Sequence, residues 1–386
     1  MLTNNILKPS VKLTIEERYT ITVEQNNSNA DVFDRIYNIE SDKIDIEYNN
    51  EGNNTSTLRL IVRSSPNIFN NEWIPKPLQY IKCQFYYVGD SVTLNAGNFQ
   101  IESVRERIGN AYDTLEIRAI SVPIIGRMYE KKNLSFNNVS LEVLLRDKAL
   151  GLNLSPKIQV PELFINANQV EQSDLDFLRT LAEQWGFNFT IDNGSLVMAG
   201  DAYFRTVPAI LTMSRSEYKS LDLEHTGYNT YASCDVSYNW LGENKTLNVK
   251  DWGVFTDNLI SLRSSRRLDH EMKFPVVSPY HAAYAGLEKL IRVNNGQIKG
   301  TLTAIGRPEL VALNNIEILG NRFNGKYQIE SAVHRFNTSD GWRCECKIRW
   351  LPKRAGPVQF TWYDMLEIAR GSIVGFGIDI PGIPGI

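Results

Sequence analysis

Apolar and polar residues alternate along much of the first 120 residues, which predicts short strands with one buried face. The alternating runs occupy residues 11–15, 19–23, 44–48, 58–62 and 81–85. The turn-rich segment 49–54, Asn-Asn-Glu-Gly-Asn-Asn, joins the third run to the fourth and predicts a hairpin. Several short strands separated by turns indicate a small barrel or sandwich.

One strand–turn–strand pattern occurs twice. Residues 99–103 read Phe-Gln-Ile-Glu-Ser and are followed by Arg107, while residues 327–331 read Tyr-Gln-Ile-Glu-Ser and are followed by Arg335 at the same offset. Each copy continues through a turn into a second alternating run, at residues 115–119 and 344–348. We interpret the two copies as an ancient duplication of one β domain.

The spacing of apolar residues becomes helical between the two copies. Ser140 precedes a leucine-rich stretch that ends at Gly151, which predicts a capped helix. Ser173 and Asp176 form a capping-box pattern, and Gly186 ends the second predicted helix. Residues 187–198 then predict a compact hairpin, so we expect a small α+β unit here.

Composition narrows the class of protein. The chain has 386 residues, of which 42% are hydrophobic and 22% charged, as in ordinary soluble globular proteins of two or three domains. A net charge of −3 gives no basic footprint of the kind that nucleic-acid binders usually carry. Residues 1–8 lack the pattern of a secretory signal, so we expect none.

The four cysteines, at positions 83, 234, 344 and 346, lack the spacing of a zinc site. Cys344 and Cys346 alternate with charged residues, so we expect both on the buried face of one strand. Only His334 is close to them in sequence, and for that histidine too packing is favoured over metal binding.

Residues 320–327 read Gly-Asn-Arg-Phe-Asn-Gly-Lys-Tyr and match a phosphate-binding loop except at the last position. Tyr327 stands there in place of the Ser or Thr that binds magnesium, and both flanks are strand-like. A phosphate loop needs a following helix to present its amide groups, so we expect a turn and no nucleotide site.

Other candidate chemistry is also better explained by structure. Asp174 and Asp176 are two positions apart on a predicted helix and point to different faces, so they form no catalytic pair. His281 is expected on a helix face. The sequence contains neither a His-Glu-x-x-His nor a Gly-x-Ser-x-Gly motif, and we predict no catalytic, cofactor-binding or metal-binding residue.

Arg263, Arg266 and Arg267 lie close together before a helix expected near residue 278. A solvated loop is favoured over contact with DNA or with an acidic partner.

Several stretches together resemble the late control D family of phage tail hub proteins, which is similar to the hub part of type VI secretion spikes. They are Ser135-Phe136 before the leucine-rich helix and Gly151-Leu152, residues 170–186 (Val-Glu-Gln-Ser-Asp-Leu-Asp-Phe-Leu-Arg-Thr-Leu-Ala-Glu-Gln-Trp-Gly) with the hairpin that follows, residues 278–290 (Ser-Pro-Tyr-His-Ala-Ala-Tyr-Ala-Gly-Leu-Glu-Lys-Leu), Gly-Arg-Pro at 306–308, Gly320, Gly-Lys-Tyr at 325–327 and His334. The resemblance covers roughly residues 40–350.

The resemblance implies a mainly β fold with an α+β insertion. Two similar, small, tube-like β-barrel domains are expected at residues 1–130 and 216–350, a helix-containing middle domain at 131–215 and a C-terminal extension at 351–386. It also implies a homotrimer that presents six similar units in a ring, adapts a sixfold tail tube to a threefold spike and leaves a central channel.

The implied partners are a tail spike protein and a tail tube or distal tube protein, with tape-measure and baseplate wedge proteins as further contacts. DNA would pass through the channel without specific binding. The implied location is the baseplate of a virion tail or injection particle, assembled in the bacterial cytoplasm, and the role is structural: not an enzyme, and without a cofactor.

The C-terminal extension departs from the resemblance. Residues 371–386 are apolar and glycine-rich but too short and too interrupted to span a bilayer, so we expect no membrane anchor. Docking on the spike or on a neighbouring subunit is one interpretation, and packing against the second β domain is the other. The candidate partner-contacting residues are Phe360, Trp362, Tyr363, Met365 and Phe376. No long repetitive β-helix extension is present, so the spike is expected to be a separate protein.

Two other function classes stay open. A hub with peptidoglycan-degrading activity would need a set of catalytic carboxylates that the sequence does not show. A β-rich cell-surface binding module would be expected to carry a secretion signal.

Overall fold

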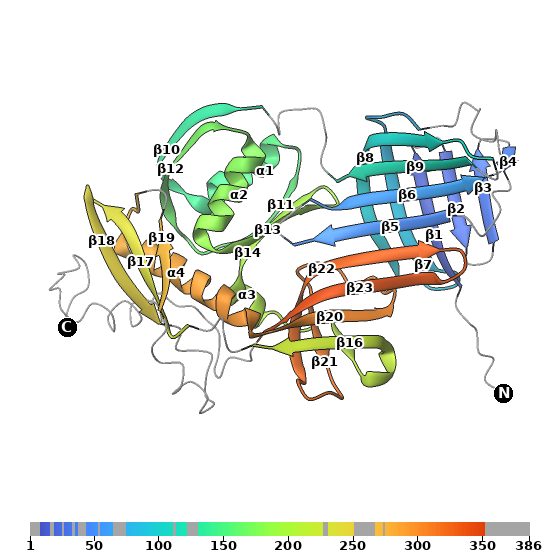
Figure 1. Cartoon of the computed structure of the whole chain (residues 1–386). Coiled ribbons are helices and arrows are strands. Elements are labelled where there is room, and N and C mark those ends of the chain that lie inside the picture. Colours follow the sequence, from blue (N-terminus) through green and yellow to red (C-terminus); the bar gives the residue numbers. More distant parts are fainter. Residues whose placement is uncertain are drawn as a thin grey trace.

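The computed structural model describes residues 8–15, 19–24, 27–32, 35–37, 44–52, 55–64, 75–110, 113–121, 130–226, 231–250, 267–272 and 275–351. Strands dominate and a few helices gather in one region, which confirms the expected mainly β fold with an α+β insertion (Figure 1). Among these residues, no helix has the length and apolar character needed to cross a membrane.

The largest sheet has 15 strands and runs through both copies of the duplicated pattern. Eight antiparallel strands lie side by side from one end of the sheet: β16 (Tyr218–His225), β20 (Ile298–Ile305), β23 (Gly341–Trp350), β22 (Gly325–Asn337), β5 (Ile44–Glu51), β6 (Thr57–Ser64), β9 (Asp113–Ile120) and β8 (Thr93–Arg107) (Figure 1). The sheet continues through β7 (Tyr80–Tyr87), β1 (Pro9–Ile15), β2 (Tyr19–Glu24), β3 (Asn27–Val32) and β4 (Arg35–Tyr37). Off this path, β15 (Leu211–Met213) pairs with β21 (Asn315–Ile318), which pairs with β22.

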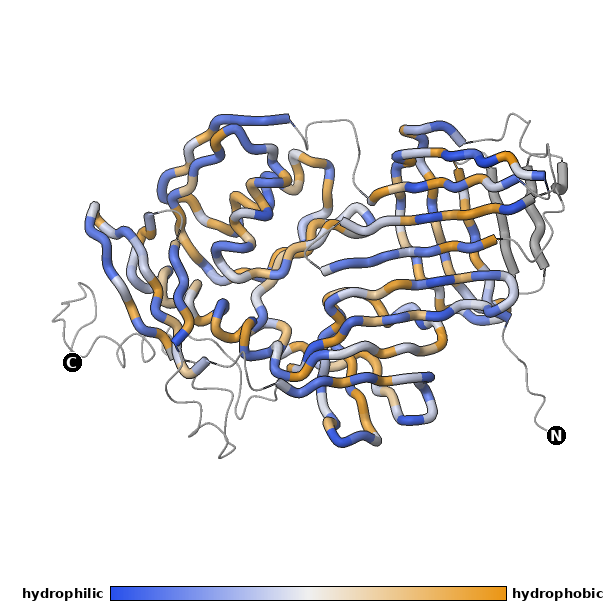
Figure 2. The backbone as a smooth tube through the Cα atoms, in the orientation of Figure 1, coloured by the Kyte–Doolittle hydropathy of each residue, from blue (hydrophilic) through white to orange (hydrophobic). Residues whose placement is uncertain are grey.

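Alternating apolar residues give these strands their buried face (Figure 2). The predicted hairpin of β5 and β6 is present, with Ile46 opposite Leu60 and Tyr48 opposite Leu58. In the first copy the apolar faces of β5, β6 and β9 pack against β1 and β7. In the second copy β20, β22 and β23 pack against β15 and β21.

The repeated Gln-Ile-Glu-Ser sequence forms the same local structure in both copies. The register between β8 and β9 shifts between Ile101 and Ser103, and the register between β22 and β23 shifts between Ile329 and Ser331. Each shift leaves the glutamate of the repeat as the extra residue of a β-bulge. A β-bulge at the same residue of both repeats is strong structural support for the duplication.

The repeated arginine also has the same role in both copies. Arg107 lies 3.9 Å from Glu116 on the next strand, and Arg335 lies 2.9 Å from Glu345 on its own next strand. The two glutamates occupy equivalent positions of the second alternating run. The duplication therefore includes a cross-strand ion pair as well as a sequence pattern.

The region between the copies contains both predicted helices, α1 (Leu141–Gly151) and α2 (Asp174–Trp185). The Ser173 hydroxyl accepts a hydrogen bond from the Asp176 N–H at 3.1 Å, and Gly186 ends α2 with a φ of 72°. The remaining elements here are β10 (Lys132–Ser140) paired with β12 (Phe164–Gln172), the sheet of β11 (Ser155–Gln159), β14 (Ser195–Gly200) and β13 (Phe187–Asp192), α3 (Asp201–Thr206) and the 3₁₀ turn η2 (Arg215–Glu217).

Residues 233–291 differ from the expected division of the chain at residue 216. Their elements are β17 (Ser233–Trp240), β18 (Glu243–Lys250), β19 (Arg267–Glu271) and α4 (Pro279–Asn294), which is followed by η4 (Asn295–Gln297). They share one hydrophobic core with α1 and α2 and not with the second β copy. Gly286 permits this packing, because a Cβ there would lie 2.2 Å from a methyl group of Val236 on β17.

Gly300 allows β16 to pair with β20, and we predict that Gly300→Ala destabilises the protein. A Cβ at Gly300 would lie 1.8 Å from the Asp222 carbonyl oxygen, so the backbone of β16 must move away. The expected loss is about 1–3 kcal/mol of unfolding free energy, measured by urea denaturation.

Gly151→Ala is the matched control. No atom lies within 4 Å of a Cβ at this last residue of α1, so the control should be neutral or more stable by about 0.5–1 kcal/mol. Equal midpoints for Gly300→Ala and the parent protein would contradict the tight pairing of β16 with β20.

Candidate functional site

The two copies are joined by antiparallel pairing of β5 with β22. The pairing runs from Glu51 opposite Ser331 to Asp45 opposite Asn337. At one end of it, the Gly52 N–H donates to the carbonyl oxygen of the bulge residue Glu330 at 2.8 Å. Because β5 and β22 are the adjoining edges of the two copies, this pairing turns two small sheets into one surface.

Beneath the pairing, aromatic side chains from both copies share a core. His334 on β22 stacks on Tyr48 of β5 with ring centroids 5.7 Å apart, and Trp342 on β23 stacks on Phe85 of β7 at 5.4 Å. His334 Nε2 lies 2.8 Å from the Leu310 carbonyl oxygen, and Trp342 Nε1 donates to His334 Nδ1 at 3.1 Å. Burial lowers the pKa of His334 to about 4, so this histidine is neutral and has a packing role.

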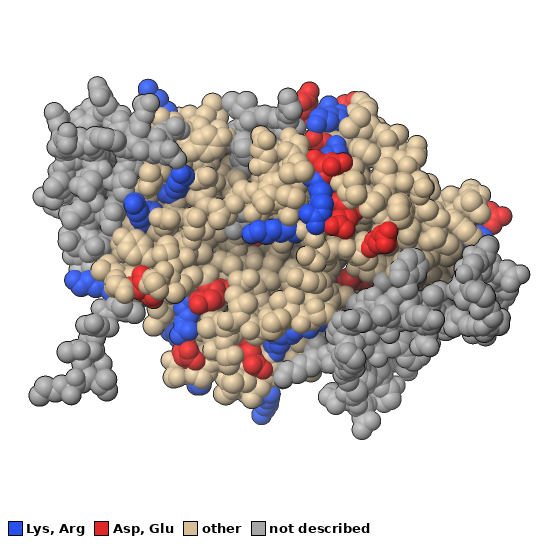
Figure 3. Space-filling model, turned by 180° about the vertical axis from the view of Figure 1, so that it is seen from behind, with Lys and Arg blue, Asp and Glu red and all other residues tan. Residues whose placement is uncertain are grey.

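The opposite face of the eight antiparallel strands is polar and carries charges of both signs. Arg335 extends over the junction between the copies and reaches Glu47 on β5 at 3.0 Å and Glu345 on β23 at 2.9 Å. In the first copy, Glu116 lies 2.9 Å from both Arg59 and Arg118. Burial would raise the pKa of Glu116, but these two arginines outweigh it and the pKa is lowered. Figure 3 views the molecule from behind and so shows a different face, on which cationic and anionic side chains also lie close together.

The eight-strand run has an unpaired edge at β16 and a partly unpaired edge at β8. β16 pairs with β20 on one side, and no described strand pairs with its other side. β8 pairs with β7 only up to Gln100, so its residues 102–107, which are exposed except for the half-buried Val104, have β9 as their single described partner strand. Unpaired N–H and C=O groups at sheet edges are ready to accept a further strand.

A buried polar cluster connects the second copy to the middle region. Arg349 of β23 forms an ion pair with Asp201 at the start of α3 at 2.6 Å, and both side chains are almost fully buried. Asn188 of β13 donates to Asp201 Oδ1 at 2.5 Å. Burial alone would raise the pKa of Asp201, but Arg349 and Arg292 lower it below its ordinary value. Breaking such a buried pair on one side typically costs about 3–5 kcal/mol.

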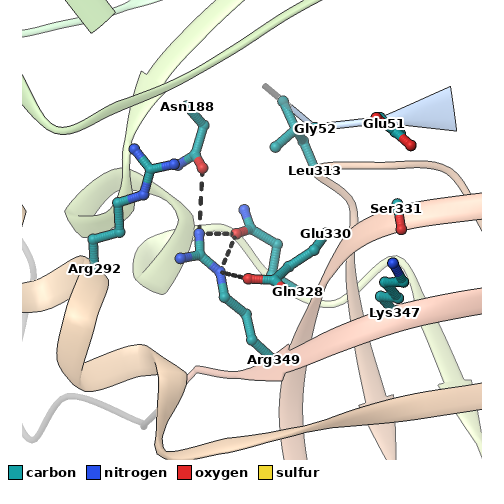
Figure 4. Close-up of a pocket in the computed structure, with 10 residues that line it drawn as sticks. All are labelled: Glu51, Gly52, Asn188, Arg292, Leu313, Gln328, Glu330, Ser331, Lys347 and Arg349. Carbon is teal, nitrogen blue, oxygen red and sulfur yellow. Dashed lines mark hydrogen bonds and ion pairs between the residues drawn. The ribbon is translucent and has the colours of Figure 1, made fainter. Parts of the chain in front are cut away.

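A cavity of about 320 Å³ opens beside this cluster, between the two copies and the middle region (Figure 4). Its lining residues come from β5 and the turn after it, β13, α4, a loop before β21, β22 and β23: Glu51, Gly52, Asn188, Arg292, Leu313, Gln328, Glu330, Ser331, Lys347 and Arg349. A second hollow of about 600 Å³ runs along β11, α3 and the loop around Ala312.

Glu288 of α4 is a second buried carboxyl group near Asp201. Tyr284 donates to it at 2.8 Å and the Ala202 N–H at 3.2 Å. Burial and the nearby charge of Asp201 raise the pKa of Glu288 to about 7. The space is confined, because a Cβ at Gly200 would lie 2.6 Å from a Glu288 carboxylate oxygen.

The sequence predictions for this part of the chain have mixed outcomes. Cys344 and Cys346 are both buried, with sulfur atoms 3.4 Å apart, and burial raises the pKa of Cys344. Among the described residues, no group of three or more His, Cys, Asp and Glu side chains could hold a metal ion. Residues 320–327, which resemble a phosphate-binding loop in sequence, form the turn between β21 and β22 and the start of β22. Lys326 there donates to the Val207 carbonyl oxygen at 3.0 Å.

Asp174 does more than the sequence predicted. It is buried and binds Lys132 of β10 and Lys148 of α1, each at 2.5 Å. Burial would raise its pKa, but hydrogen bonds from both lysines lower it. The pairing of these lysines with one helix N-terminus is a tertiary effect with no local sequence signal.

His281 is also more buried than a helix-face position suggests. It lies between Trp185 and Tyr280, with its ring centroid 6.3 Å and 5.8 Å from theirs, and burial lowers its pKa to about 4. Arg267, expected in a loop, begins strand β19 and pairs with Asp235 at 3.7 Å.

The partner-contact candidates Phe360, Trp362, Tyr363, Met365 and Phe376, and also Arg263 and Arg266, lie outside the described residues. The sequence did not reveal the junction of β5 with β22 or the cluster around Asp201. The Gln-Ile-Glu-Ser repeat was the one available signal, because Gln328 and Glu330 of its second copy belong to the cavity wall.

We predict that Glu288 makes stability depend on pH between pH 5 and 8. A raised pKa in the folded state favours folding below the unfolded pKa, and this contribution is lost as pH rises through about 7. The parent protein should lose about 2–3 kcal/mol of unfolding free energy over this range relative to Glu288→Gln.

Urea denaturation at each pH measures this difference, and Glu162→Gln, a change at an exposed residue, is the control. The control should follow the parent. Parallel pH profiles for the parent and Glu288→Gln would show that the Glu288 carboxyl group does not titrate differently on folding.

Comparison with known proteins shows which proteins share this fold. No protein-family model and no curated protein sequence matches the chain. Among solved structures, the chain is similar to a tail protein from Neisseria meningitidis MC58 (TM-score 0.59, 13% identity, covering 89% of this chain and 98% of that one). It is also similar to the 43 kDa tail protein of prophage MuSo2 from Shewanella oneidensis (TM-score 0.60, 12% identity, covering 89% of this chain and 98% of that one). A third similar structure is prophage tail protein gp18 from Listeria monocytogenes EGD-e (TM-score 0.52, 10% identity, covering 95% of this chain and 100% of that one). The chain therefore has the fold of phage tail proteins.

Proposed function

We propose that this protein is the structural baseplate hub of a phage tail or phage-like injection particle, of the late control D type. Three copies would form a ring that adapts a sixfold tail tube to a threefold central spike. The observation that carries the proposal is the continuous run of eight strands, built from two similar halves, with an unpaired edge at β16 and an unpaired stretch, residues 102–107, at the edge of β8.

The strand directions suit closure of such a ring. All seven neighbouring pairs in the run are antiparallel, so β8 at one end and β16 at the other run in opposite directions. When β16 of one copy meets β8 of the next, the two strands are antiparallel and the alternation continues. Closure would also remove both exposed edges, which a lone chain would leave open to aggregation.

Each chain contributes two similar units, so a trimer presents six around the ring. The junction of β5 with β22 joins two units within a chain, and β16 with β8 would join units of neighbouring chains. The sixfold side would match a tail tube or distal tube protein and the threefold side a spike protein, with tape-measure and wedge proteins as further partners. The location would be the baseplate.

The polar face of the eight strands would line the central channel, since the apolar face is already covered within each chain. This face has cationic and anionic side chains side by side, as at Arg335 with Glu47 and Glu345. Because charges of both signs lie side by side, such a surface has no strong electrostatic potential of one sign. This fits a channel through which DNA passes without specific binding. No catalytic residue is needed for this role, and Phe360, Trp362, Tyr363, Met365 and Phe376 remain candidates for contact with the spike.

Disulfide trapping tests the proposed subunit contact. Paired substitutions that combine Asp222→Cys or Glu224→Cys in β16 with Arg107→Cys or Arg105→Cys in β8 follow the register of the β5–β22 junction, which would place Arg107 opposite Asp222 and Arg105 opposite Glu224 and bring opposite Cβ atoms within bonding range. At least one pair should give, under mild oxidation, a covalent ladder that ends at three chains. The four native cysteines are buried, so background cross-linking should be low.

Pairs of the same β16 cysteines with Ser339→Cys, in the turn between β22 and β23, are the control and should give no ladder. A ladder that continues past three chains would indicate an open filament. That result, or no cross-link in any pair from β16 and β8, would contradict the closed trimer.

A further inference from the structure

The cavity between the two copies and the middle region contains a buried hydrogen-bond donor without a partner. Gln328 is fully buried on β22, and its Nε2 is without a hydrogen-bond partner among the described residues. Gln328 Oε1 accepts from Arg349 Nε at 3.0 Å and also from Arg349 Nη2. Because the guanidinium group can only donate, the amide cannot be turned around, and its NH₂ group must point away from Arg349.

In Figure 4 the Gln328 nitrogen points away from Arg349 and into the space among the lining residues. Leaving a buried donor unpaired is costly, so such groups are nearly always satisfied by water or by a bound molecule. The occupant of this space must therefore offer hydrogen-bond acceptors to Gln328.

Two cationic side chains flank the same space. Arg292 at the end of α4 donates one hydrogen bond, to the Phe187 carbonyl oxygen at 3.3 Å, and no described carboxylate lies within ion-pair distance of it, although its charge also acts on the nearby Asp201. Lys347 on β23 is exposed and likewise forms no ion pair within the described part of the chain. Guanidinium groups hold further N–H donors in a planar fork that matches carboxylate and phosphate oxygens.

The acidic and basic groups that remain in the lining are already engaged. Glu330 lies 3.4 Å from Lys299 Nζ and 3.7 Å from Arg349 Nε, and Glu51 accepts from Asn49 at 3.0 Å. Arg349 is paired with Asp201. Besides the Glu51 carboxylate, the side chains left to meet an incoming molecule include the donors Gln328, Arg292 and Lys347, two of them positively charged.

We propose that this cavity is a binding site for an oxyanion, a carboxylate or phosphate group held by Gln328, Arg292 and Lys347. The bound group would contact β22, β23 and α4 at once, and so tie the second copy to the middle region. The site is contained within one chain, and it stands whether or not the chain forms a trimer.

Gln328→Glu is the sharpest test. Glutamate retains an acceptor for Arg349 and nearly the same shape, but it replaces the inward-facing donor with a carboxylate oxygen that repels an anion. Isothermal titration calorimetry at constant ionic strength, with the full chain, would measure binding of inorganic phosphate and of the blocked peptide acetyl-Gly-Glu-Gly-amide. The parent should bind at least one of them saturably, and Gln328→Glu should weaken that binding by about tenfold or more.

Two matched controls separate the site from general charge effects. Gln159→Glu makes the same substitution at an exposed residue outside the cavity and should bind like the parent. Lys347→Gln should weaken binding, whereas Arg118→Gln, at the equivalent position of the first copy, should not. The Lys347 variant also keeps the test decisive if Gln328→Glu unfolds.

The two probes distinguish the source of the anionic group. Tighter binding of phosphate points to a free anion, and tighter binding of the peptide, with no binding of acetyl-Gly-Gln-Gly-amide, points to an acidic side chain of a protein. Failure of both probes to bind the parent at up to about 10 mM would overturn the proposal and leave water as the occupant. Equal binding by the parent and Lys347→Gln would also overturn it.

Discussion

The backbone pairing of β5 with β22 is the interaction that makes one surface out of two copies. Seven residue pairs, from Glu51–Ser331 to Asp45–Asn337, connect segments almost 300 residues apart in the sequence. The pairing places His334 against Tyr48 in a shared core and Arg335 against Glu47 on the opposite, polar face. Without it, each copy would expose an additional sheet edge, and the strands could not form one antiparallel run.

The middle region is held to this surface by buried polar contacts rather than by apolar packing alone. Arg349 on β23 reaches Asp201, and Lys326 on β22 donates to the Val207 carbonyl oxygen, so the second copy is connected to the start of α3 and to the residue just after its end. Buried ion pairs contribute little net stability but are costly to break on one side, which favours a single arrangement of the parts. The oxyanion site lies beside these contacts and would add to the same connection.

Local features of the fold could be predicted from the sequence because each is set by neighbouring residues. The cap at Ser173, the helix end at Gly186 and the hairpin of β5 with β6 are of this kind. The duplicated tetrapeptide also identified both hairpins, although their bulges were seen only in the structure. The junction of β5 with β22, the packing of residues 233–291 beside α1 and α2, and the cavity around Gln328 depend on contacts between distant segments. No local pattern encodes such contacts, and Asp174, read as a helix-end charge, proved to bind two lysines for the same reason.

The mass of the purified protein in solution, by light scattering after size exclusion with and without its candidate spike protein, tests the central claim most directly. If the unpaired edges of β8 and β16 close a ring, the protein should have a mass near three times 44.0 kDa, either alone or once the spike protein is added. A single-chain mass that persists at high concentration in the presence of the spike protein would contradict the ring.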